Sequence, residues 1–399
     1  MNNKKRRRYE QPLLFPRSAP NRVSIVGGYG KVGGQIAQLM SSELGERLVI
    51  AGHNEIEAYR FAQSLDTSAH WRFINIEDPT TFDKALEGVT LIVVCVDTKT
   101  LDLVHACIER GIHYIDITAS IEVIDRFKAA NELAHERGVL LLSSVGLAPG
   151  LTSLMAKACV QYSPEPVSSI SIHILLGLGE RHGKAAIGWM LNRLYQPFWV
   201  RTGPGKERRT PYVRKSKAQF SDGLGLRKTY QIDFSDQHTI PDTLNIPSAS
   251  TWFTFDVQWV ADLMSMTARL GVLQLAKYPI IHRLFVRNFA SLSFGSDRFA
   301  VSVEAHTETG MRINCSATGF GEARATAIMA SETVRHLLKM SISGGVRQLE
   351  EILELGHFLH TLTEHNIQVC ADPDILKSLI AEQEMKTIYG VHSTNEQHN

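Results

Sequence analysis

The sequence predicts an α/β protein: a Rossmann doubly wound parallel sheet, followed by a second α+β domain with a largely antiparallel sheet. Two observations carry this prediction. Between residues 22 and 143, six short apolar runs alternate with helix-like stretches, which is the pattern of βαβ units. After Gly150 the alternation stops, and the runs 299–306 and 311–320 flank a four-residue turn, as in an antiparallel hairpin. A chain of 399 residues has room for two or three domains.

The elements of the first domain follow from the period of the apolar residues. In the first expected helix, Val32, Ile36 and Met40 lie on one stripe, as in a helix packed on a sheet. The expected strands are 22–27, 47–51, 72–76, 91–96, 113–118 and 139–143. The expected helices are 31–43, 56–64, 81–86, 101–110 and 121–137.

The second part of the chain has fewer and longer periodic segments. Helices are expected at 151–161, 257–275 and 322–339, and strands at 169–178, 229–234, 299–306 and 311–320. The stretch 201–228 holds nine Lys/Arg against two acidic residues and several glycines, so it is expected to be mostly loop.

Composition excludes several classes of protein. With 44% hydrophobic and 21% charged residues the chain is not a disordered or fibrous protein. No apolar run approaches the roughly 18 residues of a membrane span. The five cysteines lack CxxC spacing, which favours a reducing, cytoplasmic setting. Residues 1–8 carry five Lys/Arg, interpreted as a disordered tail in preference to a nucleic-acid-binding or membrane-binding arm.

A glycine-rich turn is the clearest chemical signal. Gly28, Gly30 and Gly33 fit the pattern G-x-G-x-x-G directly after an expected strand and at the start of an expected helix. The first glycine permits the tight turn, the second lets the backbone approach a pyrophosphate, and the third lets helix and strand pack closely. The free N–H groups at the helix start meet the negative charge. The pattern predicts dinucleotide binding.

The choice of cofactor is read at the end of the second strand. A strict NAD binder places Asp or Glu there, whereas this chain has His53 and Asn54. Without that carboxylate a 2′-phosphate is not repelled, and both side chains can donate to it. NADP(H) is therefore the preferred cofactor, and NAD(H) stays open as the alternative.

Other catalytic motifs are absent from the sequence. The stretch 179–184 resembles a phosphate-binding loop, but its glycines are one residue too close and Ala185 replaces the Mg²⁺-binding Ser/Thr. Its cations, including His182 and Lys184, could instead receive a substrate carboxylate. No HExxH, GxSxG or paired Cys/His cluster occurs, so no metal site is predicted.

The glycine turn and three later blocks together resemble the saccharopine dehydrogenase-like NAD(P)-binding reductase family. The blocks are 27–34 (GGYGKVGG), 48–54 (LVIAGHN), 111–118 (GIHYIDIT) and 146–154 (GLAPGLTSL), with 344–346 and 358–359 similar to the closing helices. The resemblance implies a first Rossmann domain and a second domain that supplies substrate contacts and a dimer sheet. It also implies that Gly28, Tyr29, Gly30, Lys31 and Val32 contact the pyrophosphate and nicotinamide ribose. His53 stands where the family has arginine, and with Asn54 falls at the adenosine ribose. Val96, Asp97 and Thr118 fall at the edge where a nicotinamide lies.

The proton donor is left open by the sequence. Asp97, Tyr114, His182 and Lys184 are all chemically able to serve, and a structural role is favoured for Tyr114 and its neighbour Asp116. Arg298 could clamp a substrate carboxylate.

These features predict a domain order and a function. The expected domains are a disordered basic tail 1–20, an NAD(P)-binding Rossmann domain 21–150, a substrate and dimerisation domain 151–320, C-terminal helices 321–385 returning to the first domain, and a polar tail 386–399. The expected activity is an NAD(P)H-dependent oxidoreductase that reduces C=N or C=O in a small anionic metabolite, such as an amino-acid-derived imine. The alternatives are an enoyl (C=C) reductase for a carrier-bound or lipid-like substrate, and a non-catalytic dinucleotide sensor or assembly protein. A homodimer without a membrane span or a nucleic-acid partner is expected.

Overall fold

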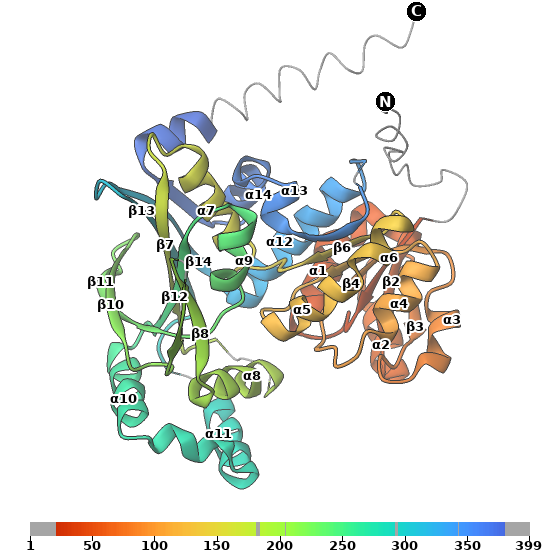
Figure 1. The fold of residues 1–399 in the computed structure, drawn as a ribbon. Coiled ribbons are helices and arrows are strands. Elements are labelled where there is room, and N and C mark those ends of the chain that lie inside the picture. The colour runs from red at the N-terminus through yellow and green to blue at the C-terminus, as the bar shows by residue number, and fades with distance from the viewer. Residues whose placement is uncertain (1–20, 181–183, 204, 292–293, 342, 380–399) are drawn as a thin grey trace, which may run out of the picture. The chain divides into compact units, whose positions relative to one another are not determined.

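The computed structural model describes residues 21–180, 184–203, 205–291, 294–341 and 343–379 (Figure 1). The chain forms two compact units. Of the described residues, the first unit contains those up to Gly146 together with Thr326–Leu349, and the second contains those from Leu147 to Ala325 and from Glu350 onward. The expected tails at 1–20 and 386–399 lie outside the described residues.

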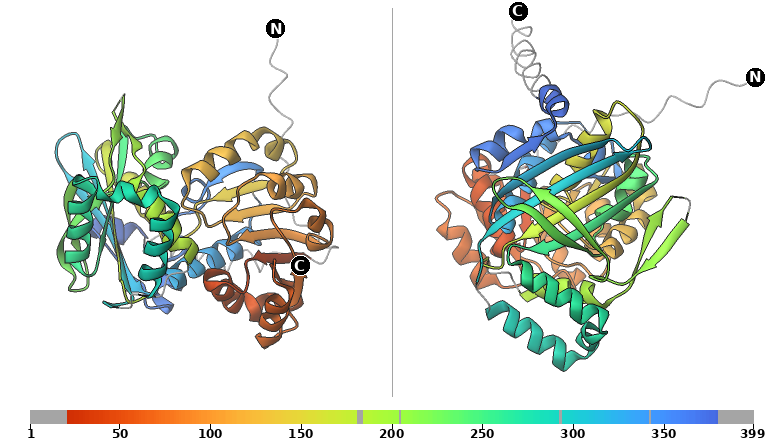
Figure 2. Two further views of the ribbon diagram at one scale, coloured as in Figure 1. Left: turned by 90° about the horizontal axis from the view of Figure 1, so that it is seen from below. Right: turned by 90° about the vertical axis from the view of Figure 1, so that its left-hand side faces the viewer.

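The first unit is a parallel sheet with helices on both faces (Figure 2). Its seven strands have the order β15-β6-β5-β4-β1-β2-β3, and every pair is parallel. The strands are β1 (Arg22–Val26), β2 (Leu48–Gly52), β3 (His70–Phe73), β4 (Val89–Val94), β5 (His113–Asp116), β6 (Leu140–Ser143) and β15 (Gly345–Gln348). The order reverses at β1, and this confirms the predicted doubly wound fold.

The helices of this unit match the predicted stripes. They are α1 (Lys31–Leu44), α2 (Glu55–Ser64), α3 (Phe82–Ala85), α4 (Asp102–Glu109), α5 (Ile121–Ala129), α6 (Asn131–Glu136) and most of α12 (Glu322–Leu337), with short 3₁₀ turns η1 (Gly45–Arg47) and η2 (Pro79–Thr81). Arg335 of α12 donates to Glu43 and to the Leu39 carbonyl of α1, so these two helices lie side by side. The single helix expected at 121–137 is interrupted at Ala130.

The seventh strand, β15, was not predicted. Its residues were expected to begin closing helices, but Gly345–Gln348 pairs in parallel with Leu140–Ser143 of β6. Gly345 has a φ of +117°, and a Cβ on Gly344 would lie 2.6 Å from the Gly138 carbonyl carbon. The two glycines therefore let the chain approach the sheet edge closely enough to pair with it.

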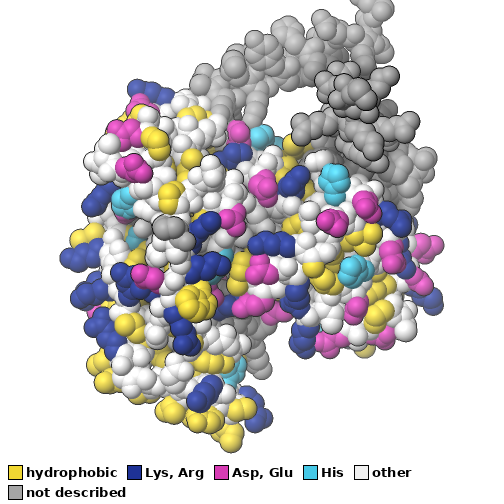
Figure 3. Space-filling view, in the orientation of Figure 1, with side chains coloured by type: hydrophobic (Ala, Val, Ile, Leu, Met, Phe, Trp, Pro, Cys, Tyr) yellow, Lys and Arg dark blue, Asp and Glu magenta, His cyan; other side chains and the backbone are white. Residues whose placement is uncertain are grey.

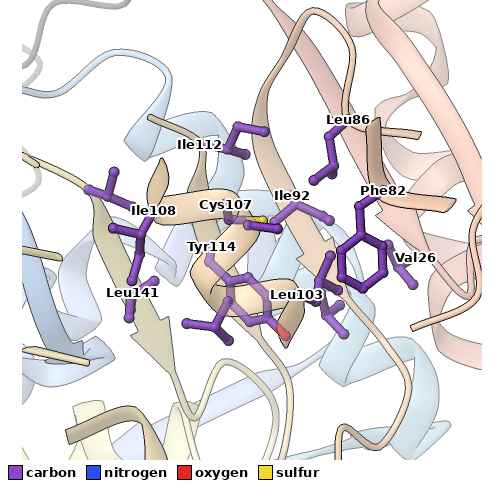
Figure 4. Close-up of a cluster of buried hydrophobic side chains, with 14 of the residues drawn as sticks. Val26, Phe82, Leu86, Ile92, Leu103, Cys107, Ile108, Ile112, Tyr114 and Leu141 are labelled. Atoms are coloured by element: carbon purple, nitrogen blue, oxygen red, sulfur yellow. The ribbon is translucent and has the colours of Figure 1, made fainter. Parts of the chain in front are cut away.

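The core of the first unit is built from the buried faces of these elements. Figure 4 shows Tyr114, Ile92 and Leu141 from the strands together with Leu103 and Cys107 from α4. Strand β2 is buried at all five positions, as expected for a parallel strand covered on both faces. Each large aliphatic side chain buried in this way contributes roughly 1.5–3 kcal/mol, which makes the sheet a rigid base for the loops at its edge.

The second unit contains a mixed sheet that is antiparallel except at one pair. The strand order is β10-β11-β12-β7-β13-β14-β16, and only β12 and β7 run parallel. The strands are β7 (Val167–Leu176), β10 (Lys215–Phe220), β11 (Gly225–Gln231), β12 (Ser248–Phe255), β13 (Arg298–Thr307), β14 (Arg312–Phe320) and β16 (Gln368–Ala371), with β8 (Phe198–Thr202) and β9 (Gly205–Arg209) in a separate pair. The predicted hairpin is confirmed as β13 and β14.

The helices of the second unit include the predicted one at 151–161. They are α7 (Leu151–Gln161), α8 (Lys184–Tyr195), α9 (Asp236–Thr243), α10 (Gln258–Arg269), α11 (Pro279–Ser291), α13 (Leu349–Ile352) and α14 (Leu359–Glu364), with η3 (Val272–Lys277) and η4 (Leu355–His357). The helix expected at 257–275 ends earlier, because Gly271 takes a left-handed conformation that separates α10 from η3.

The expectation of a loop at 201–228 was wrong. This stretch contains β9, β10 and parts of β8 and β11. In β10, Ala218 and Phe220 are buried while Lys215, Lys217 and Gln219 are exposed, so one face is buried and the other is cationic. Buried and exposed residues alternate here, as is normal for an antiparallel strand, but the lysines at the exposed positions made the segment resemble a charged loop. No helix among the described residues is long and apolar enough to cross a membrane.

Candidate functional site

The glycine turn joins the end of β1 to the start of α1. Gly27 has a φ of +77°, and its N–H donates to the Ala51 carbonyl of β2 (2.8 Å). The Gly30 N–H donates back to the Gly27 carbonyl (2.9 Å). These two bonds close the turn at the carboxyl edge of the sheet, next to the end of β2.

Two glycines of the motif occupy positions where a side chain does not fit. A Cβ on Gly28 would lie 2.7 Å from the Ile25 carbonyl oxygen, and a Cβ on Gly33 would lie 2.3 Å from the Gly27 carbonyl oxygen. Because both obstacles are backbone atoms, they cannot rotate away. The turn and the helix are therefore as close as the motif requires for a pyrophosphate cradle.

The N-terminus of α1 suits an anion. Gly30 occupies the N-cap without a side chain to accept from the first N–H groups, and the first turn of the helix, all of which the structure describes, contains no acidic residue. The backbone N–H groups of the first turn, which have no acceptor within the helix, and the helix dipole favour a bound phosphate at this point. The residues present thus fit the diphosphate of a dinucleotide.

Tyr29 connects the glycine turn to the end of β2. Its hydroxyl accepts from the Asn54 N–H (3.0 Å), and a Cβ on Gly52 would lie 2.4 Å from the tyrosine ring. The ring thus lies directly over Gly52, where the adenosine ribose of a dinucleotide is expected. This contact joins residues 25 positions apart and was not predicted from the sequence.

His53 and Asn54 differ in what they offer a ligand. His53 is exposed. The Asn54 side-chain oxygen accepts from the Glu57 N–H (3.2 Å) and caps α2. The Nδ2 group of Asn54 is therefore the group that can donate a hydrogen bond to a phosphate. Asn54 contacts Tyr29, and His53 precedes it in the chain. The next carboxylates along the chain belong to Glu55 and Glu57, in the exposed first turn of α2.

The loops after β4 and β5 form the edge where a nicotinamide is expected. Val96 and Asp97 follow β4 and are exposed. Arg126 of α5 donates to the Thr98 carbonyl (2.9 Å) and holds this loop. After β5, the Thr118 N–H donates to the Asp116 carboxylate (2.7 Å). Arg126 thus holds the loop after β4, and Asp116 holds the loop after β5, while Asp97 is exposed at the surface.

Tyr114 and Asp116 are buried beneath this edge. The Tyr114 hydroxyl donates to Asp116 (3.4 Å), and its ring packs edge-on against Phe127. Burial raises the pKa of Tyr114, and burial raises the pKa of Asp116 from 3.8 to about 7. Tyr114 and Asp116 therefore have a structural role: Tyr114 binds Asp116, and Asp116 holds the loop at Thr118.

The raised pKa of Asp116 predicts a pH effect on stability. The folded protein binds this proton more tightly than the unfolded chain, so the stabilisation is full below about pH 4 and is lost as the pH rises towards 7. We expect the free energy of unfolding of Asp116→Asn to fall less between these values than that of the wild type, while the amide oxygen still accepts from Thr118. Urea unfolding across this pH range measures the difference. Asp125→Asn, at an exposed carboxylate, is the control, and parallel curves for Asp116→Asn and wild type would contradict the assignment.

The remaining predicted residues lie in the second unit. His182 lies outside the described residues; Lys184 begins α8. In the same loop Glu180 accepts from the Glu322 N–H (2.6 Å), at the start of α12. Arg298 donates to the carbonyl (2.8 Å) and carboxylate of Asp222, so a substrate carboxylate would have to replace that contact.

A buried charge cluster in the second unit was missed. Asp233 accepts from Arg193 of α8 (2.9 Å) and Gln237 (3.1 Å), and lies 2.6 Å from His238 Nε2. Asp233 and Arg193 are both below one-tenth exposed. The spacing of five residues between Asp233 and His238 could have indicated their contact. The contact with Arg193 could not be predicted, because Arg193 lies forty residues away in the sequence. No group of three His, Cys, Asp or Glu residues in the described part of the chain could hold a metal ion.

Comparisons with known proteins concern the sequence of the first unit and the overall fold. Residues 23–142 match the family described as the saccharopine dehydrogenase NADP binding domain. The fold resembles apo saccharopine dehydrogenase (L-Glu forming) from Saccharomyces cerevisiae, with a TM-score of 0.61 and 12% identity over 88% of this chain and 99% of that chain. A meso-dapdh mutant from Clostridium tetani gives a TM-score of 0.41 and 13% identity, covering 87% and 99% of the two chains. No curated protein matches the sequence.

Proposed function

We propose that this chain, whose residues 23–142 match the saccharopine dehydrogenase NADP binding domain, is an NAD(P)-dependent oxidoreductase. Its proposed reaction is the reduction of the C=N or C=O bond of a small anionic metabolite. A nicotinamide dinucleotide held at the glycine turn would supply a hydride for the carbon of the double bond, while a protein side chain or water would supply the proton for the nitrogen or oxygen. An amino-acid-derived imine would leave as a secondary amine, and the cofactor would leave oxidised.

The observation that carries the proposal is the glycine turn with its open helix N-terminus. The close approach of Gly33 to Gly27 and the absence of a side-chain cap at the start of α1 support a diphosphate site at this turn. The substrate class is supported by the cationic surface of the second unit, where Lys215 and Lys217 are exposed on β10. An anionic substrate would be attracted to such a surface.

We propose that the proton donor is an exposed residue at the nicotinamide edge and not the buried Tyr114. Tyr114 is buried with its hydroxyl on Asp116, so it is poorly placed to reach a substrate. Asp97 is exposed at the edge that follows β4, where the nicotinamide of a Rossmann fold lies. Asp97 is therefore the first residue to test, by comparing the pH profiles of kcat for wild type and Asp97→Asn.

We further propose that NADP(H) is preferred, because His53 and Asn54 replace the carboxylate that selects NAD. His53→Asp is expected to weaken NADPH binding about 10- to 100-fold, since a carboxylate would repel the 2′-phosphate. NADH should be affected far less, since a carboxylate can accept from its 2′-hydroxyl. Fluorescence titration of both cofactors measures the two Kd values.

His105→Asp provides the matched control, because His105 is an exposed histidine on α4. It should leave both Kd values unchanged. Equal effects of His53→Asp on the two cofactors would remove His53 from the site.

The reaction itself is tested with deuterated NADPH. Deuterium should appear at the carbon next to nitrogen when amino acids and 2-oxo acids are supplied together. Incorporation into a C=C bond of an enoyl substrate would favour the alternative reductase, and cofactor binding without any transfer would favour a non-catalytic sensor. We also propose that the protein is a cytoplasmic homodimer.

A further inference from the structure

The outer side of α10, η3 and α11 exposes many large apolar side chains. In α10, Trp259, Leu263, Met266 and Leu270 recur at intervals of four and three residues, so they share one face of the helix. Leu270 is 70% exposed and Ile280 76% exposed. We call this surface the α10–α11 face, formed by Trp259, Leu263, Met266, Leu270, Val272, Leu275, Tyr278, Ile280 and Leu284.

Among the described residues, the second unit buries little of this face: Trp259 stacks on Phe294, with ring centroids 6.1 Å apart, but stays 61% exposed. Helix α10 packs on β11 and β12, and its buried residues are Val260, Ala261 and Ser265. In η3 the buried residues are Leu273 and Ala276. Helix α10 and η3 therefore have one apolar side in the core of the unit and a second apolar side that is exposed, which a monomeric protein seldom shows over such a length.

The charge around the face has one sign. Residues 263–296 contain four Lys/Arg and no Asp or Glu: Arg269, Lys277, Arg283 and Arg287. The preceding acid, Asp262, accepts from the Tyr230 hydroxyl (2.6 Å) and Lys228 (3.0 Å), so its charge is already compensated. In the lower part of Figure 3, apolar side chains gather beside Lys and Arg over these helices.

The charge decides between two possible occupants. In a two-fold contact between copies of this chain, each face would meet the same face of its partner, and cations would meet cations. An anionic lipid surface instead matches both properties, since it accepts apolar side chains between its headgroups and attracts Lys and Arg. Trp259 and Tyr278 are of the types enriched at such interfaces.

We propose that the α10–α11 face binds the surface of an anionic lipid bilayer, with both helices lying in the plane of the headgroups. The helices are 12 and 13 residues long, and binding of this kind is peripheral and reversible. Each Lys or Arg near an anionic surface contributes about 1 kcal/mol, and this part weakens as salt is added.

The test is sedimentation of the full-length protein with phosphatidylcholine vesicles, with and without phosphatidylglycerol. Wild type should sediment with the anionic vesicles at low salt, and much less with neutral ones. Leu270→Glu/Ile280→Glu should weaken binding at least about tenfold, because two carboxylates oppose both burial and the lipid charge. Lys277→Gln/Arg283→Gln should weaken binding only to the anionic vesicles.

The matched control is Ile56→Glu/Trp199→Glu, which adds the same charge at apolar residues that are 61% and 57% exposed outside the face. It should bind like wild type. Thermal unfolding and NADPH titration of every variant show whether fold and cofactor site are retained, so the result is independent of the proposed reaction.

Three results would overturn the proposal. Wild type could stay in the supernatant with anionic vesicles at low salt. The control Ile56→Glu/Trp199→Glu could lose vesicle binding as strongly as Leu270→Glu/Ile280→Glu, which would show that added negative charge weakens binding wherever it is placed. Light scattering could reveal a dimer that Leu270→Glu/Ile280→Glu dissociates, which would assign the face to a second copy of the chain.

Discussion

Gly33→Ala is expected to weaken NADPH binding about 100-fold, equivalent to roughly 3 kcal/mol. The added Cβ would lie 2.3 Å from the Gly27 carbonyl oxygen, so α1 and the turn must separate. The separation displaces the N–H groups at the start of α1, which are the expected diphosphate ligands. Fluorescence titration gives the change in Kd, and thermal unfolding reports the accompanying loss of stability.

Gly205→Ala is the matched substitution for this experiment. Its Cβ would have its nearest neighbour at 3.9 Å, an ordinary contact, so it should leave the NADPH Kd unchanged. A Gly33→Ala protein that binds NADPH like wild type would show that the close contact between helix and turn is not needed for the cofactor.

Asp233→Ala is expected to lower the free energy of unfolding by about 3–5 kcal/mol. The substitution removes the carboxylate that compensates the buried guanidinium of Arg193, while the desolvation of that cation remains. Urea unfolding measures the effect. Replacing both residues, as in Arg193→Met/Asp233→Leu, should recover most of the loss, because no buried charge is then left unbalanced.

The control uses another Arg–Asp pair of the same unit. Arg201 and Asp242 also form an ion pair (2.7 Å), but their side chains are 44% and 67% exposed. Asp242→Ala should therefore change stability by less than about 1 kcal/mol. Similar losses for Asp233→Ala and Asp242→Ala would show that burial does not set the value of these pairs.

The first unit could be predicted well because its signals are local. Strand β2 is an uninterrupted apolar run that is buried at every position, and α1 shows its buried stripe within fourteen residues. The glycine turn is likewise local at two of its positions, since a Cβ on Gly28 would meet the Ile25 carbonyl oxygen and a Cβ on Gly33 would meet the Gly27 carbonyl oxygen. Its position after β1 and before α1 followed directly from the sequence.

The missed features depend on residues far apart in the chain. Tyr29 reaches Asn54, and Arg193 reaches Asp233, through contacts that no short window of sequence contains. The strands within 201–228 were not predicted for a different reason. Their exposed positions carry long charged side chains, and the two buried residues of β10 are too few for a clear alternation of apolar and polar residues. The comparison with saccharopine dehydrogenase concerns the fold and leaves the substrate open.

Strand β15 has a consequence for how the protein is made. Its partner β6 ends at Ser143, whereas β15 begins at Gly345, so about two hundred residues are synthesised between them. During that time the emerging chain holds a sheet whose last strand has an uncovered row of N–H and C=O groups. A fragment that stops after β6 would keep this open row permanently, so expression of the first unit alone calls for grafting 326–349 behind Gly146.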